Sequence, residues 1–317
     1  KCIENKKKNS KQLLMIFHSF RMAISFHLLF LKQPNLKLIR MKNVKQILLV
    51  IIVATFYLTS CTKDEVVNAT DTNTVVASAT IDAINELDFK TGTQVTFENS
   101  LSKSTNKLTV NSLVGACATI TVDNLTPNVF PKVITIDFGT GCTANNITRK
   151  GKLKVTLSGL VSTPKATMKI ERENYYVNGL KVEGTVVYVN ETVTPNIPQW
   201  SRTITNGKLT NLEGMVFLNS GTHTIKQMEG VGTPLVLSDN TYEMTQGNHT
   251  VSKENGPSLT LTVAESLIKK YDCNYVSKGK LTVKGSLLNG TIDYGNGDCD
   301  NKFTYTHENG VVFNLTM

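Results

Sequence analysis

Acidic and amide side chains gather in one short segment near the C-terminus, Asp293 to Asn301. It holds three carboxylates, those of Asp293, Asp298 and Asp300, together with two amides. Oxygen ligands of this kind suit a hard cation, so these aspartates are the candidate ligands for calcium, and no other cofactor is indicated. The segment lacks the spacing and the distal glutamate of an EF-hand, and Asp and Asn beside Gly also favour tight turns. A disulfide-pinned turn is therefore the alternative interpretation.

Four cysteines lie beyond the N-terminal leader: Cys117, Cys142, Cys273 and Cys299. Thiols of an exported protein normally pair. Two nearly equal spacings, and an echo of Thr135–Cys142 in Thr291–Cys299, favour the pairs Cys117 with Cys142 and Cys273 with Cys299. A four-cysteine zinc site would need close CxxC pairs, which the sequence lacks.

Recognisable catalytic motifs are missing, since no GxSxG, HExxH, Walker or Rossmann pattern occurs. The histidines beyond the leader fit no motif and are expected at solvent-facing strand positions: His223, His249 and His307. Four acids are candidates for glycan hydrolysis, but no pair stands out among them: Asp137, Glu171, Glu173 and Glu183. The sequence therefore favours a non-enzymatic role, but distant residues can meet in a fold, so it does not decide between the two.

The central region carries aromatic residues that could form a binding platform: Tyr175, Tyr176, Tyr188 and Trp200. Packing in the core or between strands is the favoured use of these rings. Just before them, Arg172 stands between two glutamates. We expect it on a charged strand edge of the kind that discourages unwanted pairing.

A secretory leader starts at Met41. Two lysines are followed by the uncharged run Ile47–Leu58 and by Leu-Thr-Ser-Cys, which resembles a bacterial lipobox. Residues 41–60 are therefore predicted to be a lipoprotein signal peptide and Cys61 the lipidated residue, so that the lipid anchors the protein in a membrane. Residues 1–40 are interpreted as translated upstream DNA, with a membrane helix over 13–31 as the alternative.

Residues 61–79 are predicted to be a flexible tether. Its start, Thr62 to Glu65, resembles the acidic export tag of surface lipoproteins of Bacteroidota, which indicates the outer membrane and exposure at the cell surface. A plain solvated tether is the alternative.

Positive charge is concentrated in the leader. Residues 1–60 hold eleven of the 34 Lys and Arg but one of the 25 acids, which leaves 23 bases and 24 acids from Cys61 onward. A net charge of −1 (23 − 24) on the body excludes the usual argument for a nucleic-acid partner.

The body, residues 80–317, alternates apolar and polar residues over most of its length, as Leu153, Val155 and Leu157 illustrate. Residues 80–89 are predicted to form one short helix. Six Asn-Gly pairs predict tight hairpins: those that begin at Asn178, Asn206, Asn255, Asn289, Asn296 and Asn309. The fold class is therefore all-β, with hairpin-rich antiparallel sheets in a sandwich or a half-open barrel. The internal echo suggests two related β units, at about 80–190 and 191–317.

Several segments resemble a group of flavobacterial-type outer-membrane lipoproteins of Bacteroidota to which no activity is assigned. The resemblance runs from Cys117 to the C-terminus and rests on Phe130–Gly139, Cys142, Arg149–Leu153, Glu173–Gly179, Val182–Thr185 and Asp293–Asn301. It implies a β-rich envelope lipoprotein and carries over no catalytic residue.

These patterns predict a lipid-anchored envelope protein that serves as a surface binding or structural module for an extracellular or envelope ligand. A periplasm-facing lipid carrier or scaffold is the alternative, and a glycan hydrolase is the less favoured one.

Overall fold

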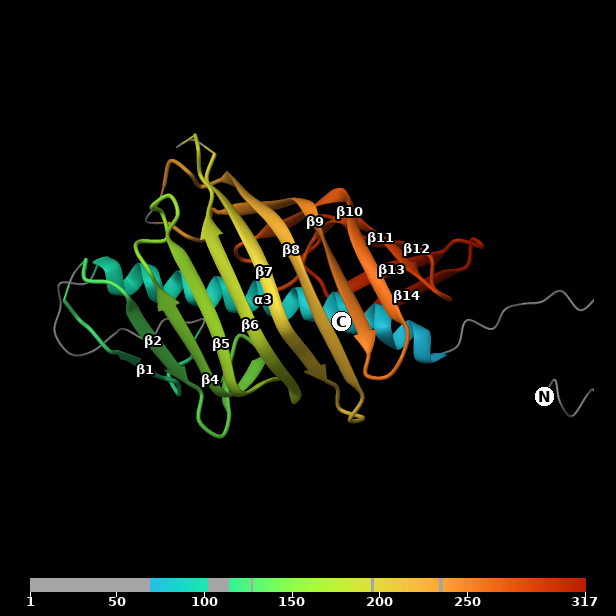
Figure 1. Ribbon diagram of the computed structural model, residues 1–317, viewed down its shortest axis with the longest axis horizontal. Coiled ribbons are helices and arrows are strands. Elements are labelled where there is room, and N and C mark those ends of the chain that lie inside the picture. The colour runs from blue at the N-terminus through green and yellow to red at the C-terminus, as the bar shows by residue number, and fades with distance from the viewer. Residues whose placement is uncertain (1–68, 102–113, 127, 195–196, 234–235) are drawn as a thin grey trace, which may run out of the picture. The chain divides into compact units, whose positions relative to one another are not determined.

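The computed structural model describes residues 69–101, 114–126, 128–194, 197–233 and 236–317, with the side chains of the helix described for 72–96. Cys61 and both leader segments lie outside the described residues. The described residues form one helix and fourteen strands (Figure 1). Their bounds are α3 (Ala69–Leu101), β1 (Thr119–Val122), β2 (Lys132–Asp137), β3 (Cys142–Ala144), β4 (Ile147–Leu157), β5 (Thr167–Val177), β6 (Leu180–Asn190), β7 (Gln199–Thr210), β8 (Val216–Glu229), β9 (Thr241–Lys253), β10 (Ser258–Lys270), β11 (Lys278–Gly285), β12 (Gly290–Asn296), β13 (Lys302–His307) and β14 (Val312–Thr316).

The strands form a single antiparallel meander. Each strand pairs with its neighbour in the sequence, except that β4 pairs with both β2 and β3. The first and last strands, β1 and β14, are not paired with each other, so the sheet is not closed. The predicted all-β antiparallel class is confirmed, but the strands make one sheet rather than the two layers of a sandwich. The two expected β units are parts of this one sheet.

Tight Asn-Gly turns join several of these strands. Asn178 and Gly179, between β5 and β6, have φ angles of 49° and 86°. Positive φ at both central residues is what a type I′ hairpin requires, and Asn and Gly tolerate it best. The predicted hairpin is confirmed at this turn. The one predicted at Asn206 is wrong, because Asn206 and Gly207 lie inside β7, where the pairing with β8 shifts register.

Bulges and glycines bend the long strands near their middles. The pairing of β4 with β5 shifts beside Gly151, and that of β6 with β7 shifts beside Gly184. A Cβ on Gly151 would lie 1.9 Å from the carbonyl oxygen of Asn174, so no side chain fits there. Bulges increase local twist and bend a strand. The sheet thereby curves around α3, which side chains from β4 to β12 contact (Figure 1).

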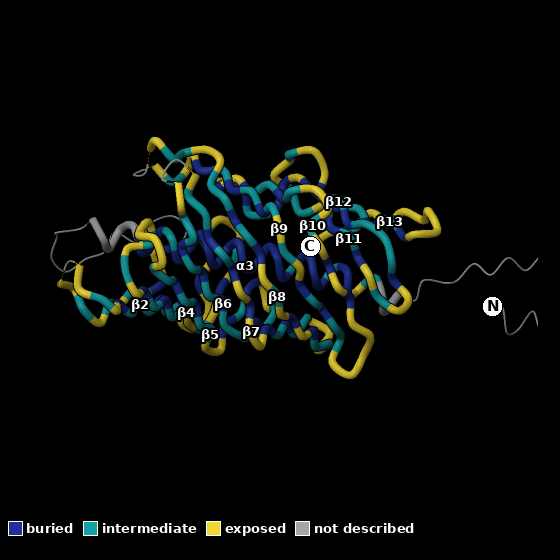
Figure 2. The backbone as a smooth tube through the Cα atoms, turned by 45° about the horizontal axis from the view of Figure 1, so that its top comes forward, coloured by how far each residue is buried: buried dark blue, intermediate teal, exposed yellow. Residues whose placement is uncertain are grey.

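Helix α3 is longer than the sequence predicts, since it spans Ala69–Leu101 instead of residues 80–89. It includes residues 69–79, which the sequence places in a flexible tether. Nearly every described side chain of the helix is buried, polar ones included (Figure 2). Because the sheet covers the helix on several sides, tertiary packing stabilises a sequence with weak helical periodicity.

Both predicted disulfides are confirmed. Cys117 pairs with Cys142 and Cys273 with Cys299, at Cα separations of 5.5 and 5.2 Å. Each bond joins a residue that precedes a hairpin to one that follows it, the hairpins being β1–β2 and β11–β12. The repeated segments also share a turn, because Asp137 and Asp293 each accept a hydrogen bond from the N–H two residues later. The two similar sequence segments therefore have similar local structures.

Candidate functional site

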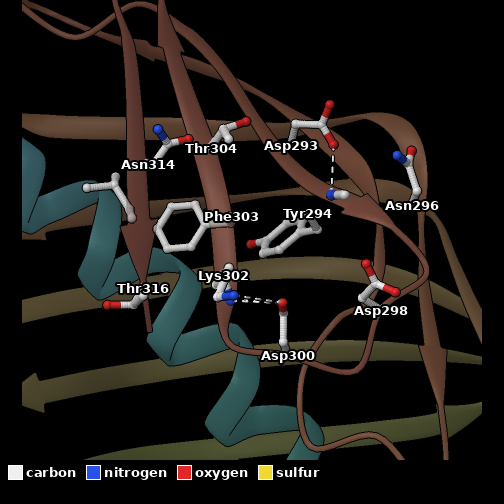
Figure 3. Close-up of a pocket in the computed structure, with 12 residues that line it drawn as sticks. Asp293, Tyr294, Asn296, Asp298, Asp300, Lys302, Phe303, Thr304, Asn314 and Thr316 are labelled. Carbon is white, nitrogen blue, oxygen red and sulfur yellow. Dashed lines mark hydrogen bonds and ion pairs between the residues drawn. The ribbon is translucent and has the colours of Figure 1, made fainter.

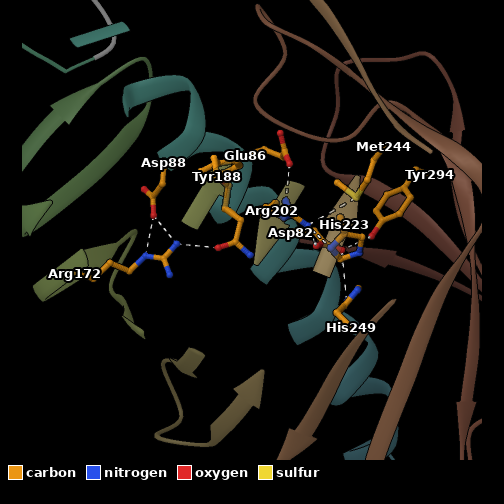
Figure 4. Close-up of polar contacts among 11 residues, drawn as sticks. Asp82, Glu86, Asp88, Arg172, Tyr188, Arg202, His223, Met244, His249 and Tyr294 are labelled. Carbon is orange, nitrogen blue, oxygen red and sulfur yellow. Dashed lines mark hydrogen bonds and ion pairs between the residues drawn. The ribbon is translucent and has the colours of Figure 1, made fainter. Parts of the chain in front are cut away.

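Ionisable side chains gather first in the interior, between α3 and the sheet (Figure 4). Arg202 of β7 donates to Glu86 Oε1 at 2.7 Å and lies 3.5 Å from Asp82 Oδ1. One helical turn separates these two acids, so both face the same strand. All three side chains are at most 3% exposed. We call the residues around Arg202 the interior cluster: Ser78, Asp82, Glu86, Arg202, His223, His249 and Tyr294.

A second arginine, Arg172 of β5, also binds side chains of α3. Arg172 donates through Nε and Nη2 to Asp88 Oδ2, at 2.9 and 2.7 Å, and through Nη2 to Asn85 Oδ1 at 2.8 Å. The Tyr175 hydroxyl donates to the other carboxylate oxygen of Asp88 at 2.8 Å. Arg172 therefore points inward, and its predicted place on a charged strand edge is wrong. Its positive charge compensates the buried negative charge of Asp88 on α3.

The two histidines of the interior cluster are buried, so their predicted solvent-facing positions are wrong. His223 Nδ1 lies 3.0 Å from Arg202 Nη2. Because arginine only donates, this nitrogen accepts, and a neutral ring satisfies the contact. Burial lowers the pKa of His223 well below its usual value, and neighbouring Arg202 and His249 lower it further. Burial also lowers the pKa of His249, against the pull of Asp82. His307 is buried as well.

Three residues of the interior cluster have the side-chain types of a nucleophilic triad. Ser78 Oγ lies 3.0 Å from His249 Nε2, and Asp82 Oδ2 lies 3.7 Å from the same nitrogen. A triad places the serine and the acid on opposite ring nitrogens. His249 Nδ1 instead is buried without a hydrogen bond. The group is therefore not arranged for nucleophilic catalysis.

Burial also acts on Glu86 and on a nearby lysine. It raises the pKa of Glu86, against Arg202 and Lys269, and lowers the pKa of Lys269 to about 8. The ammonium of Lys269 donates to the carbonyl oxygen of Cys273. Lys269 thus links the neighbourhood of Glu86 to the second disulfide. The interior cluster itself holds the polar side chains of α3 against the inner face of the sheet.

A second cluster of polar side chains is open to solvent. A pocket of about 500 Å³ lies where β12, β13 and β14 meet (Figure 3). Asp293, Thr304 and Asn314 occupy facing register positions on the three strands. The turn after β12 adds polar groups, and the pocket is lined by Asp293, Tyr294, Gly295, Asn296, Asp298, Asp300, Lys302, Phe303, Thr304, Asn314, Leu315 and Thr316. We call this the C-terminal pocket.

The three predicted calcium ligands all line the C-terminal pocket. Asp293 accepts from the N–H of Gly295 at 2.9 Å and lies 3.8 Å from Lys280 Nζ. Asp300 accepts from the N–H of Lys302 at 3.0 Å. Within the described ranges, no three His, Cys, Asp or Glu side chains form a group that could hold a metal ion. The three aspartates therefore line one pocket but do not lie close enough together to coordinate one metal ion.

The predicted hydrolase acids lie apart from this pocket; Glu173 is exposed, and the other three pair with lysines. Asp137 pairs with Lys152 at 3.2 Å. Glu171 pairs with Lys169 and Glu183 with Lys181, each at 3.0 Å. The hydrogen bond from Gly139, followed by that from Lys152, lowers the pKa of Asp137. Paired with bases, these acids do not form the facing carboxylates that glycoside hydrolysis uses.

The predicted aromatic residues serve mostly as core. Tyr175, Tyr188 and Trp200 are buried, and the Tyr188 ring packs 4.7 Å from that of Phe89 on α3. The exposed platform is therefore not formed by these three rings. Sequence reasoning missed Asp82, Glu86 and Asp88, although their spacing on the predicted helix was visible.

Comparisons with known proteins place the chain in no family: no family matches it, and neither a curated protein nor a solved structure is significantly similar to it. Over the part of the chain that the structure describes, α3 included, no helix has the length and apolar character of a membrane span.

Proposed function

We propose that this chain is a lipid-anchored protein of a bacterial outer membrane whose β body is a non-enzymatic binding module for a polyhydroxylated ligand such as a glycan. The C-terminal pocket is its binding site. Cys61 carries the lipid, and the body faces the outside of the cell.

The observation that carries the binding site is the composition of the C-terminal pocket. Carboxylate, amide and hydroxyl groups line it, and a single lysine opposes three aspartates. Pockets on a rigid scaffold with a few fixed polar groups are typical of ligand recognition. Hydroxyl-rich ligands use such donors and acceptors without needing a charge of their own.

A binding role fits the contrast between accessible and inaccessible groups. The closely packed acids, bases and histidines of the interior cluster are buried by α3 and the sheet. A substrate does not reach groups that are this deeply buried. The C-terminal pocket instead offers polar groups that are accessible to solvent, and there Asp293 and Asp300 contact backbone N–H groups and lysines.

The lipid-carrier alternative meets an obstacle in the fold. A carrier needs an apolar surface to shelter an acyl chain. The face of the sheet toward the interior is covered by α3, which presents Asp82, Glu86 and Asp88 to it. That face is therefore neither empty nor apolar where the helix lies.

The anchor is tested by fractionating cells that produce Cys61→Ala. We expect the variant to leave the membrane fraction, and continued firm attachment would rule out lipidation at this residue. Protease treatment of intact cells tests the orientation. Released body peptides support exposure at the surface, whereas protection until the outer membrane is opened places the body in the periplasm.

The binding site is tested with the detergent-solubilised full chain on a glycan array. Asp298→Asn and Asn314→Ala should each abolish or strongly weaken any signal. Glu213→Gln is the matched control, because Glu213 is an exposed acid on a distant turn. Equal signals from all three variants would remove the C-terminal pocket from the proposal.

A further inference from the structure

A line of short polar side chains crosses the outer face of the sheet. Each strand from β7 to β13 contributes one member, and successive members are direct register partners. Neighbouring strands lie about 4.7–4.9 Å apart, so one type of group repeats at that spacing over roughly 30 Å. We call this line the threonine row: Thr203, Thr222, Asn248, Thr262, Thr282, Thr291 and Thr306.

The threonine row faces away from α3. Arg202 and His249, which are next to Thr203 and Asn248 in their strands, point inward and contact acids of α3. Because successive side chains point to opposite faces of a strand, the row lies on the outer face. Its members on β7 to β10 are exposed, and those on β11 to β13 are half-buried.

The polar groups of the threonine row are available to a ligand. Over the part of the chain that the structure describes, its hydroxyls and the Asn248 amide form no hydrogen bond with the protein. Thr143 and Thr148, on β3 and β4, differ in this respect, since their hydroxyls bond each other at 2.8 Å. A hydroxyl can donate and accept, and an amide offers both kinds of group as well.

The centre of the threonine row is uncharged. Lys280, Lys284 and Asp293 flank it on β11 and β12, where Lys280 pairs with Glu265 at 2.8 Å. Threonine is favoured in strands, but protein surfaces usually contain about 25–35% charged residues. On β7 to β10, uncharged polar residues also occupy the outer positions beside the row: Ser201, Thr205, Ser220, Thr224, Gln246, Thr250 and Thr260.

A pocket adjoins the threonine row at each end. At the β7–β9 end, Ser220 and Thr250 are each two residues from a member of the row and line a pocket of about 350 Å³. At the other end, Thr304 and Asn314 line the C-terminal pocket, and Thr304 is two residues from Thr306. The row therefore connects the proposed binding site to a second pocket on the same face.

The chemistry of the threonine row favours an uncharged ligand that repeats. Nucleic acids and other acidic polymers bind through lysine and arginine, and the centre of the row has neither. Protein partners use aromatic and apolar anchors at the centre of an interface, and the row has none. A chain of neutral sugars carries hydroxyl donors and acceptors at regular intervals, as the row does.

The curvature of the sheet bears on a second repeating surface, that of ice. An ice face is flat, whereas β-bulges bend strands of this sheet, as where the register of β7 with β8 shifts between Ile204 and Gly207. A single polymer chain follows a curved surface. The curved row therefore fits a polysaccharide better than a crystal face.

We propose that an extended, uncharged polysaccharide lies along the threonine row, across the strands, and reaches the C-terminal pocket. This inference rests on the proposed binding of a glycan. It specifies the ligand as a chain of neutral sugars, whose successive units exchange hydrogen bonds with the hydroxyls of successive strands.

The experiment measures binding of the detergent-solubilised full chain to linear oligosaccharides of increasing length from β-glucan, mannan and xylan. Thr262→Val with Thr282→Val removes two facing hydroxyls from the middle of the row and keeps β-branched side chains. Thr121→Val with Thr135→Val is the matched control, because it removes a facing pair from β1 and β2, away from the row. Unchanged thermal unfolding confirms the fold of each variant.

We expect the affinity to rise with oligosaccharide length until the ligand spans the threonine row. The row variant should bind about tenfold more weakly than the wild type, since each lost hydrogen bond contributes a few-fold. The control variant should keep the wild-type affinity. Loss of binding in the row variant alone, with full binding by Asp298→Asn, supports the row and removes the C-terminal pocket as the site.

An affinity that is already maximal for a disaccharide, or equal binding by the two double variants, overturns the role of the threonine row. If Asp298→Asn abolishes that binding, the C-terminal pocket stands without the row. Failure of the wild type to bind any of these ligands overturns both the row and the proposed glycan binding. Stronger binding to polygalacturonate identifies an acidic polymer, and thermal hysteresis that the row variant loses identifies ice. Either result overturns the proposal.

Discussion

Ionisable side chains cluster in two regions of this molecule, and the two regions differ in their access to solvent. In the interior cluster, Asp82 and Glu86 face Arg202 and are closed off from solvent. In the C-terminal pocket, Asp298 is exposed, and Asp293 and Asp300 contact backbone N–H groups and lysines at the surface. The first arrangement positions a helix, and the second is open to a ligand. Charge density alone therefore does not distinguish the two regions, whereas access to solvent does.

The largest effect should come from breaking the interior cluster. Arg202→Met leaves Glu86 and Asp82 buried without their cation, and we expect it to lower the free energy of unfolding by about 3–5 kcal/mol. Urea denaturation measures the change. Lys152→Met is the matched control, because it removes an exposed partner of Asp137. Its cost should be far smaller, since solvent screens an exposed ion pair. Equal costs for the two variants would show that the cluster does not hold the helix.

Removal of either disulfide should cost nearly as much. Replacing both cysteines of a pair by serine opens a loop of 25 or 26 residues, for which we expect a loss of about 3 kcal/mol. Both double variants should unfold at similarly reduced urea concentrations. Ligand binding sharpens the comparison, since Cys299 lies in the turn of the C-terminal pocket. Binding that is lost in the Cys117–Cys142 variant but kept in the other would contradict our assignment of the pocket.

Acid should weaken the interior cluster through its histidines. The pKa values of His223 and His249 are lowered in the folded protein, so the unfolded chain takes up more protons as pH falls below about 6.5. The stability that the neutral rings contribute is present above that pH and is lost below it, by up to about 1.4 kcal/mol per histidine and pH unit. The raised pKa of Glu86 acts in the opposite sense.

Unfolding curves between about pH 7.5 and 5.5, followed by the fluorescence of Trp200, measure this dependence. His223→Gln with His249→Gln should flatten it. A slope unchanged by the double variant would assign the acid sensitivity to other groups.

The smallest effect on stability is expected in the C-terminal pocket. Asp298→Asn changes an exposed side chain, so the free energy of unfolding should stay within about 0.5 kcal/mol of the wild type. The same substitution should still remove glycan binding. A large loss of stability would mean that this region, like the interior, uses its charges for architecture.

Much of the fold could be predicted from the sequence. Alternation in segments such as Leu153–Leu157 predicted the strands, and Asn178–Gly179 predicted a hairpin. Both disulfide pairs followed from spacing and from the repeated segment around Asp137 and Asp293. These features depend on residues that are close in the sequence, where local conformation and period carry the information.

The interior cluster could not be predicted in the same way. His223 and Arg202 meet across two neighbouring strands, and Arg202 also meets an acid of a helix more than a hundred residues away. Strand periodicity shows that two residues share a face of the sheet. It does not show whether an acidic side chain from another element packs against that face. The full length of α3 was missed for the same reason, because residues 69–79 are helical in the context of a sheet formed later in the chain.

The meander and the buried helix form contacts over different distances in the sequence, and this difference affects the order in which the chain folds. Strand pairs join sequence neighbours, and such local contacts form quickly. Helix α3 instead reaches partners as distant as Tyr294, 212 residues beyond Asp82. Because synthesis starts at the N-terminus, the helix leaves the ribosome before any strand that covers it. We therefore expect the acids of α3 to stay hydrated while the sheet grows strand by strand, and the last strands to complete their burial.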